Sequence, residues 1–370
     1  MPCRADAASV SWIDDTGALV DAVASWGDVI GLDTEFQRTD TFFPVPGLYQ
    51  VISGEDVYFL DPLSIDDFSA FADVLHDPAI VKVMHACSED LELIRHHLGV
   101  EPQGIFDTQL AYAFQNSRYS VSYANLVAAL LGHDLGKHAT RSNWLRRPLT
   151  EEQLHYAWED VRYLPEVYEA LTARLDELGR RSWFADAMAE KGRVQGAHPD
   201  EYYRGVKKAW RLDALELGVL KRLCAWRERR AMAEDVPRNR VVWDEHLVEF
   251  ARLGSLSETD VHERLPGPVA RRYASELTAE HREGVSAGLA EPLLARPLSP
   301  SESKVSRTLR DLAWHKADTM EFARELLARK RDVEACIRHW LDTGELSPAY
   351  SGWRAGLIGE EFLAVLEHAP

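Results

Sequence analysis

The chain is poor in cysteine, in long apolar runs and in basic charge. Its 370 residues include four cysteines, which lie far apart and form no Cys-x-x-Cys pair. This spacing argues against a disulfide framework and indicates reduced thiols. No apolar run approaches the ~20 residues that cross a bilayer, and residues 1–15 lack the basic and apolar segments of a secretory signal. We therefore expect a cytoplasmic protein with no membrane association.

Basic residues are outnumbered by acidic ones. The chain has 42 Lys and Arg against 60 Asp and Glu, a formal net charge of −18. Because a polyanion-binding protein usually carries a basic field, this balance argues against tight general binding of nucleic acid. The acidic excess is uneven, since residues 137–147 carry four basic residues and no acidic one, and residues 200–243 carry eleven basic and seven acidic ones. Local basic patches are therefore expected.

The length and the residue pattern predict an α/β domain followed by helices. A chain of this size with 46% hydrophobic and 28% charged residues is typical of a soluble protein with two or three domains. Short apolar runs predict strands at 28–34, 48–53, 56–60, 80–84 and 104–106, with helices near 66–76 and 88–98. Gly54 between two of these runs indicates a hairpin, so we expect a mixed sheet flanked by helices. Segment 191–200 indicates a linker, and the prolines at 292–300 mark a second break.

Two acidic residues stand one apart at the end of an apolar run, Ile30-Gly31-Leu32-Asp33-Thr34-Glu35-Phe36. Strand side chains alternate between the two faces of a sheet, so Asp33 and Glu35 project close together from one face. Carboxylates held that close raise each other's pKa unless a cation lies between them. The pattern indicates a metal site, although a turn after a strand is the plainer interpretation of this stretch alone.

A third acidic residue, Asp90, follows another short apolar run. It falls in the first turn of the helix expected at 88–98, for which Ser88 is the expected N-cap. A carboxylate in that position is favoured by the helix dipole, so Asp90 alone has an ordinary structural explanation.

A tyrosine and a fourth acidic residue lie further along the chain. Tyr156 and Asp160 are four residues apart in a helix expected from Glu151 to Arg174, with Thr150 as its cap, so both lie on one face. A Tyr–Asp pair on a helix is commonly a surface hydrogen bond. The order of the acids and the tyrosine, rather than any one of them, points to a site.

Taken in order, these residues resemble the tyrosine branch of the DEDD superfamily of 3′→5′ exonucleases, and the surrounding sequence resembles the ribonuclease D family within it. The motifs that carry the resemblance are Asp33-Thr34-Glu35-Phe36, His85-Ala86-Cys87-Ser88-Glu89-Asp90-Leu91, Ile105-Phe106-Asp107-Thr108-Gln109, Arg141-Ser142-Asn143-Trp144-Leu145-Arg146-Arg147-Pro148-Leu149-Thr150 and Tyr156-Ala157-Trp158-Glu159-Asp160-Val161. The resemblance implies an RNase H-like exonuclease domain at 10–195, an HRDC domain at 205–287 and a second, degenerate HRDC-like helical domain at 295–370.

The same resemblance implies a metal-dependent 3′→5′ exoribonuclease that releases 5′-nucleoside monophosphates and trims structured RNA such as tRNA precursors. Two Mg²⁺ or Mn²⁺ ions would be held by Asp33, Glu35, Asp90 and Asp160, since hard cations prefer carboxylate oxygens. In the family's pattern Asp33 bridges both ions, Glu35 and Asp160 complete the nucleophile-side ion, and Asp90 holds the other. Tyr156 would orient the attacking water. The implied partner is RNA with a single-stranded 3′ end, and the implied state is a monomer.

Aromatic and basic residues near these motifs are the candidates for RNA contact, because rings stack on bases and cations meet phosphates. The candidates are Phe36, Phe42, Phe43, His85, Lys137, Arg141 and Arg146, and, in the HRDC-like segment, Arg227, Arg229, Arg230, Arg238 and Arg240. A core ring, a hydrogen-bonded histidine or a solvated arginine is the structural alternative for each. We expect Trp226 and Trp243 in the core of the HRDC-like segment, and Asp107 as the cap of a helix at 109–115.

Two other functions stay open from the sequence. A DNA exonuclease of the same superfamily would share the metal chemistry, because RNA and DNA differ at the 2′-OH, whose contacts the sequence does not reveal. A non-catalytic RNA-binding scaffold would be favoured by loss of a metal carboxylate, and all four are present.

Overall fold

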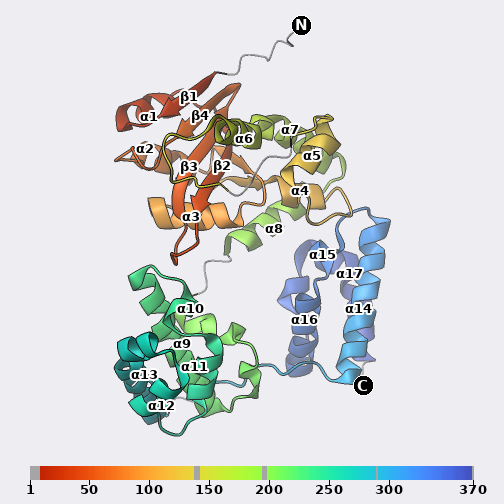
Figure 1. The fold of residues 1–370 in the computed structure, drawn as a ribbon. Helices are drawn as coiled ribbons and strands as arrows, with labels where there is room; N and C mark the ends of the chain where they lie inside the picture. Colours follow the sequence, from red (N-terminus) through yellow and green to blue (C-terminus); the bar gives the residue numbers. More distant parts are fainter. Residues whose placement is uncertain (1–8, 137–141, 194–197, 289–290, 369–370) are drawn as a thin grey trace. The chain divides into compact units, whose positions relative to one another are not determined.

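The structure, a computed structural model, describes residues 9–136, 142–193, 198–288 and 291–368 (Figure 1). The chain forms two compact units. The sheet unit comprises Met1–Gln37, Pro46–Arg193 and Leu298–Pro370, and the helical unit comprises Arg38–Val45 and Val194–Pro297. Among the described residues, no helix is long and apolar enough to cross a membrane.

A mixed sheet of six strands forms the framework of the sheet unit. The strands are β1 (Val10–Ile13), β2 (Val29–Gln37), β3 (Val45–Ser53), β4 (Asp56–Leu60), β5 (Val81–Met84) and β6 (Ile105–Asp107). They lie in the order β1-β4-β3-β2-β5-β6. The pairs β1–β4, β2–β5 and β5–β6 are parallel, whereas β3 and β4 form the expected antiparallel hairpin around Gly54. The edge strand β1 was missed because most of its four residues are solvent-accessible and give no apolar run.

Helices cover both faces of this sheet. One hydrophobic cluster joins β-strand residues such as Ile30 and Leu32 to α1 (Thr16–Val23), α2 (Ser69–His76) and α3 (Ser88–Leu98). A second cluster lies on the face of Leu48 and Ile52. It takes in α4 (Thr108–Ala113), α5 (Tyr123–Leu131), α6 (Glu151–Arg162), α7 (Leu164–Glu177) and α8 (Arg181–Arg193).

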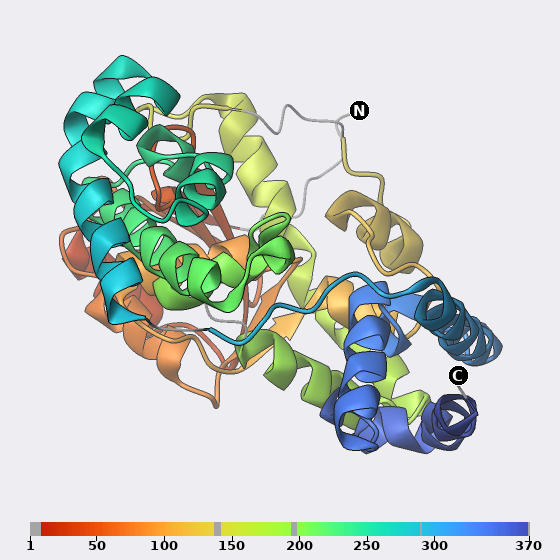
Figure 2. The same cartoon turned by 90° about the horizontal axis from the view of Figure 1, so that it is seen from below.

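The C-terminal helices share this second cluster and so belong to the sheet unit. Figure 2 draws these helices in blue. They are α14 (Pro300–Thr319), α15 (Arg324–Leu327), α16 (Lys330–Thr343), the short 3₁₀ helix η3 (Pro348–Tyr350) and α17 (Gly352–Glu367). Arg180 joins the two parts, because its guanidinium donates to the carbonyl oxygens of Phe114 at 2.6 Å and Met320 at 2.5 Å. Trp183 of α8 stacks on Trp353 of α17, with ring centroids 5.1 Å apart.

The helical unit has its own core. Its elements are η1 (Pro199–Gly205), η2 (Ala209–Arg211), α9 (Ala214–Glu234), α10 (Arg238–Val241), α11 (Asp244–Ala251), α12 (Glu258–Arg264) and α13 (Gly267–Ala287). The segment Arg38–Val45, which connects β2 to β3, packs into this unit. Phe42 is buried in its core, and the Asp235 carboxylate accepts the backbone N–H groups of Phe42 and Phe43 at 2.9 and 3.0 Å.

Three sequence predictions need correction. The helix expected from Glu151 to Arg174 is broken, because α6 ends at Arg162 and α7 starts at Leu164 with a proline in its first turn, where the missing N–H is tolerated. Ser88 does not cap α3; the N-cap position is Cys87, and no side chain bonds there. Trp226 is buried as expected, but Trp243 is 55% exposed.

Gly31 allows the close packing of β2 against its neighbours. A Cβ atom at this position would lie 2.5 Å from Cγ2 of Ile52 and 2.8 Å from Cβ of Leu164 in α7. Overpacking of this kind costs about 1–3 kcal/mol. We expect Gly31→Ala to lower the free energy of unfolding by about 2 kcal/mol in urea denaturation. Gly27→Ala is the matched control, since nothing lies within 4 Å of its added Cβ; equal midpoints for the two variants would contradict this account of the packing.

Candidate active site

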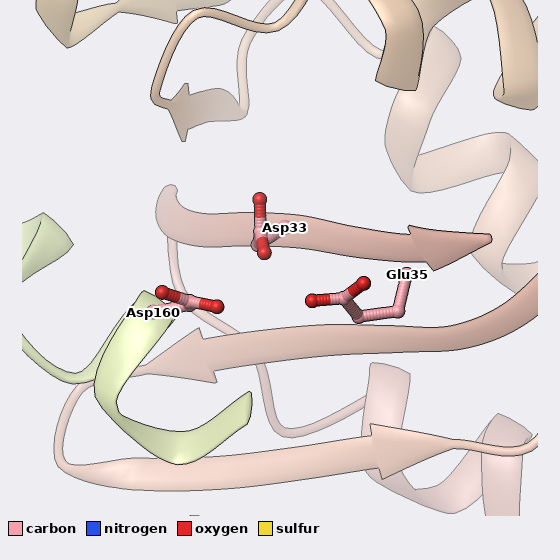
Figure 3. Close-up of side chains that lie close together, drawn as sticks. All are labelled: Asp33, Glu35 and Asp160. Atoms are coloured by element: carbon pink, nitrogen blue, oxygen red, sulfur yellow. The ribbon is translucent and has the colours of Figure 1, made fainter. Parts of the chain in front are cut away.

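Three carboxylates converge on one face of the sheet. Asp33 and Glu35 extend from β2 and Asp160 extends from α6, and Figure 3 shows their carboxylates turned toward one another. One oxygen from each lies within 4.8 Å of the others, and all three side chains are half-buried. The alternation of β2 therefore produces the pairing that the Asp-x-Glu spacing predicts. The donor set consists only of oxygen atoms, which fits a hard divalent cation.

The protonation of these groups reflects their crowding. Burial, followed by the charges of Asp160, Asp90 and Glu35, raises the pKa of Asp33 well above its usual value. Burial and the charges of Asp160 and Asp90 raise the pKa of Glu35 to about 9. Burial raises the pKa of Asp160 to about 7, against a hydrogen bond from Tyr156 that lowers it. Without a cation the cluster thus favours protonated carboxyl groups over adjacent anions.

Asp90 lies outside this cluster of three. It sits in the first turn of α3 and is buried, and its Oδ1 accepts a hydrogen bond from the Thr34 hydroxyl at 2.5 Å. Thr34 stands between Asp33 and Glu35 in sequence, so its side chain points to the opposite face of β2. Burial raises the pKa of Asp90 to about 6, although the bond from Thr34 lowers it. The charge of Asp90 also raises the pKa values of Asp33 and Glu35, which places it beside the cluster.

Tyr156 lies one helical turn before Asp160 and is hydrogen-bonded to it. Burial and then the charges of Asp160, Glu35 and Asp33 raise the pKa of the Tyr156 phenol, which is therefore protonated in the metal-free protein. The ring packs near that of Trp144, with centroids 6.1 Å apart. The i, i+4 spacing of Tyr156 and Asp160 correctly placed both on the face of α6 that looks onto the carboxylates.

The start of α6 is fixed by two sets of contacts. Thr150 caps the helix as predicted, in a reciprocal capping box with Gln153. Just before it, the Arg147 guanidinium makes two hydrogen bonds to the Asp61 carboxylate at 2.6 and 2.8 Å and donates to the Gly47 carbonyl oxygen at 2.7 Å. The basic run at 137–147 therefore contributes one structural arginine rather than four free cations.

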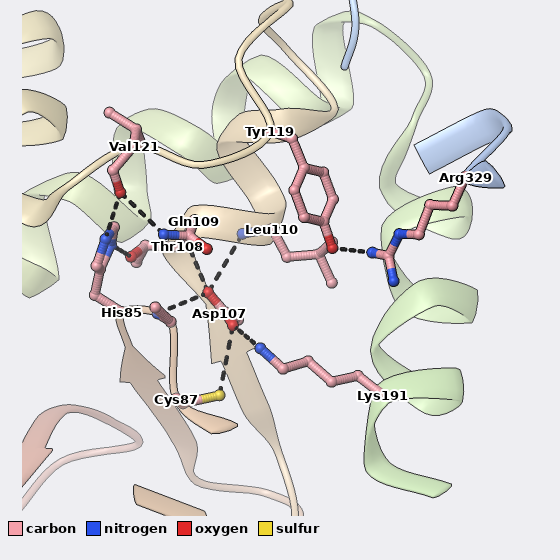
Figure 4. A network of polar contacts seen from close by, with 11 residues as sticks. His85, Cys87, Asp107, Thr108, Gln109, Leu110, Tyr119, Val121, Lys191 and Arg329 are labelled. Atoms are coloured by element: carbon pink, nitrogen blue, oxygen red, sulfur yellow. Dashed lines mark hydrogen bonds and ion pairs between the residues drawn. The ribbon is translucent and has the colours of Figure 1, made fainter. Parts of the chain in front are cut away.

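A second polar network anchors the turn that leads into α3 (Figure 4). The buried Asp107 carboxylate caps α4 through the backbone N–H groups of Gln109 and Leu110, as predicted, and also accepts the N–H of Ala86 at 3.1 Å. Lys191 of α8 forms an ion pair with it. Charge from Lys191 and these hydrogen bonds lower the pKa of Asp107 despite its burial. Asp107 is thus a structural anion, distinct from the carboxylates of the cluster.

His85 belongs to this network and not to the carboxylate cluster. Its Nδ1 lies 2.8 Å from the Thr108 hydroxyl and its Nε2 lies 2.9 Å from the Val121 carbonyl oxygen. Both ring nitrogens are therefore engaged within the protein, which supports the structural alternative for this residue. Burial lowers the pKa of the imidazole.

The other RNA-contact candidates lie in varied environments. Phe36 is half-buried and packs on the cluster beneath α1–α3. Phe42 is buried with the Arg238 guanidinium 4.7 Å from its ring centroid, and Phe43 is half-buried against it. Burial leaves Phe42 no free face for a base. Arg146 is exposed, whereas Lys137 and Arg141 lie outside the described residues.

The arginines proposed for the HRDC-like segment are all ion-paired within the helical unit. Arg227 is buried, with Glu228 and Asp244 as partners. The remaining pairs are Arg229–Asp200, Arg230–Glu234, Arg230–Glu276, Arg238–Glu228 and Arg240–Asp40. Because Arg227 is buried, it is the arginine of this group that is least able to contact RNA. Contact by the others stays a prediction.

Sequence reasoning missed the residues that support the site. Thr34 could have been found, because it is the one position between two acids on a strand. Arg147 and Asp61 are 86 residues apart, and nothing in either local sequence indicates the partner.

Comparisons with known proteins agree with this geometry. A family model described as 3′-5′ exonuclease matches residues 10–176, and one described as HRDC domain matches residues 216–280. The chain is 40% identical to ribonuclease D of Pseudomonas paraeruginosa, over 98% of this chain and 99% of that protein. It is 34% identical to ribonuclease D of Escherichia coli K12, over 96% of this chain and 97% of that protein.

A solved structure extends the similarity to the fold. The crystal structure of Escherichia coli RNase D, described as an exoribonuclease involved in structured RNA processing, superposes with a TM-score of 0.88 at 32% identity. The match covers 97% of this chain and 99% of that one. The similarity extends over nearly the whole chain and includes the domain that holds the carboxylate cluster and its neighbouring tyrosine. The chain therefore belongs to the ribonuclease D family of 3′→5′ exoribonucleases.

Proposed function

We propose that the protein uses two divalent ions, Mg²⁺ or Mn²⁺, to remove 5′-nucleoside monophosphates from the single-stranded 3′ end of structured RNA, tRNA precursors being the expected substrate. The observation that supports this most is the convergence of Asp33, Glu35 and Asp160 within 4.8 Å. Half-buried carboxylates at that spacing need a cation to be charged together, and an all-oxygen donor set suits a hard cation.

Each residue has a place in the reaction. Water attacks the terminal phosphorus, the bond from phosphorus to the 3′ oxygen breaks, and that oxygen takes up a proton as the mononucleotide leaves. Bound divalent ions lower the pKa of water and stabilise the charge on the phosphate. Asp33 would serve both ions, Glu35 and Asp160 the ion on the nucleophile side, and Asp90 the other. Tyr156 would orient the attacking water, since its raised pKa keeps the phenol protonated.

The proposal of a structured RNA substrate is based on the relatives. The Escherichia coli protein is described as acting in structured RNA processing, and this chain matches it over nearly its whole length. A DNA exonuclease stays the alternative, because the metal cluster alone does not read the sugar. The cytoplasmic location, the monomeric state and the domain limits 10–195, 205–287 and 295–370 stay predictions.

Product analysis on a hairpin RNA with a single-stranded 3′ tail tests the function. With Mg²⁺ or Mn²⁺ we expect 5′-mononucleotides, with digestion slowing at the stem, and we expect no products with a chelator. A blunt hairpin and a DNA tail serve as comparison substrates, and Asp33→Asn serves as the control protein. Equal cleavage by Asp33→Asn, or equal rates on DNA, would overturn the proposal.

Replacing Tyr156 by Phe removes the hydroxyl and keeps the ring. We expect kcat to fall about 100-fold, the scale of a lost proton-transfer or water-orienting group. Affinity for RNA, measured by fluorescence anisotropy in chelator, should stay within about twofold. Tyr168→Phe is the control, since that ring packs on Phe106 in the hydrophobic cluster. A loss of affinity equal to the loss of kcat would assign Tyr156 to RNA binding instead.

The stability of the metal-free protein should fall as pH rises. Unfolded carboxylates titrate near pH 4, whereas the folded values are about 6 for Asp90, about 7 for Asp160 and about 9 for Glu35. These three groups therefore hold more protons in the folded state than in the unfolded state between about pH 4 and about pH 9, and their contribution to the free energy of unfolding declines across that window. Mn²⁺ should raise the thermal midpoint more at about pH 8 than at about pH 6, because fewer protons must be displaced.

The matching control for this titration is Glu35→Gln, which removes the group whose pKa is the highest of these three and should flatten the slope of stability against pH in chelator. Thermal midpoints that are independent of pH in chelator would contradict the electrostatic account of the cluster.

A further inference from the structure

Gln50 in β3 is a buried amide without a partner. Its side chain is fully buried, and neither its amide nitrogen nor its amide oxygen has a hydrogen-bond partner among the described residues. Buried side-chain amides in folded proteins are almost always bonded, and an orphan one is costly. The position of Gln50 therefore raises the question of which neighbouring group its amide serves.

The packing of β2 against β3 fixes where this amide lies. The strands are neighbours in the sheet. A Cβ at Gly31 would lie 2.5 Å from Cγ2 of Ile52, and a Cβ at Gly47 would lie 3.1 Å from the Glu35 carbonyl oxygen. Residue numbers thus fall along β3 as they rise along β2. Two residues beyond Gly31 is Asp33, and two residues before Ile52 is Gln50, so these two positions lie side by side.

The alternation of side chains then places both groups on one face. Gly31 and Ile52 meet on the face covered by α7, and positions two residues away point the same way. Of the inner positions of β2 and β3 on this face, the polar side chains are Asp33, Glu35 and Gln50. The orphan amide therefore stands next to the carboxylate that is central to the cluster.

We propose that Gln50 is a positioning residue for the metal site, whose amide N–H donates to the Asp33 carboxylate when that carboxylate binds a divalent cation. The inference rests on the proposed metal site. A carboxylate that serves as a metal ligand needs its orientation fixed, and a neighbouring hydrogen-bond donor does this in many metal sites.

Gln50→Met tests this, because it keeps the volume and removes the amide. In chelator its thermal midpoint should equal or exceed that of the wild type, since no hydrogen bond is lost and an orphan polar group is removed. Its affinity for Mn²⁺, measured by isothermal titration calorimetry without RNA, should fall about tenfold. A purely structural glutamine would give the opposite pattern, with a lower midpoint in chelator and unchanged Mn²⁺ affinity.

Tyr350→Phe is the matched control. Its hydroxyl is also a buried orphan, but it lies in η3 of the C-terminal helices. It should leave the Mn²⁺ affinity unchanged. If Gln50→Met does not fold, Gln50→Glu replaces it and should lower the midpoint in chelator and enlarge the rise that Mn²⁺ produces, because it adds an anion beside Asp33.

The outcomes separate the two proposals. If the wild type binds no Mn²⁺, the proposed metal-dependent function fails. If the wild type binds Mn²⁺ and Gln50→Met binds it equally well, only the role of Gln50 is overturned.

Discussion

The close approach of buried carboxylates is the constraint on which the rest of the sheet unit depends. Like charges at such separations repel strongly where water is scarce, and the raised pKa values of Asp33, Glu35 and Asp160 express that repulsion as retained protons. A fold can hold such a cluster only if other interactions fix the segments that carry it. The repulsion among the carboxylates destabilises the fold at one place. The burial of apolar side chains that compensates for it is spread over the two hydrophobic clusters on the faces of the sheet. The three carboxylates offer only oxygen donors, the type of ligand that a hard divalent cation prefers.

Two carboxylates outside the cluster hold in place the segments that carry it, and each of the two forms an ion pair. Asp61 takes the Arg147 guanidinium and so fastens the chain just before α6, the helix of Tyr156 and Asp160. Asp107 takes Lys191 and the N–H of Ala86, and so fastens the turn before α3, the helix of Asp90. The pKa values of the paired structural acids Asp61 and Asp107 are therefore lowered, whereas those of the clustered acids are raised.

Sequence reasoning succeeded where the signal is local. The shared face of Asp33 and Glu35 follows from period two, that of Tyr156 and Asp160 from the i, i+4 spacing, and the caps Thr150 and Asp107 from side-chain chemistry. It failed where tertiary partners decide. Phe42 was a candidate for RNA contact because its local sequence does not show that its ring is buried, or that the Asp235 carboxylate, 193 residues away, accepts its backbone N–H. The same limit hid the pairing of Arg147 with Asp61, because the two residues are 86 positions apart. Propensity also missed the break at Tyr163, where one proline splits a continuous helical pattern.

The charge of the helical unit shows why a count of basic residues overstates affinity for a polyanion. Residues 200–243 contain eleven Lys and Arg, but eight of them form ion pairs with acids of the same unit, among them Arg204, Lys221 and Arg222 as well as the five arginines considered for RNA contact. A paired arginine brings little net field to a phosphate, because its partner's charge cancels it beyond a few Å. The cations of this segment that are exposed and have no ion pair among the described residues are Lys207, Lys208 and Arg211. They flank Trp210, which is 37% exposed with the Arg211 guanidinium 5.0 Å from its ring centroid. These three cations are therefore the part of the segment's positive charge that no acid of the same unit offsets among the described residues.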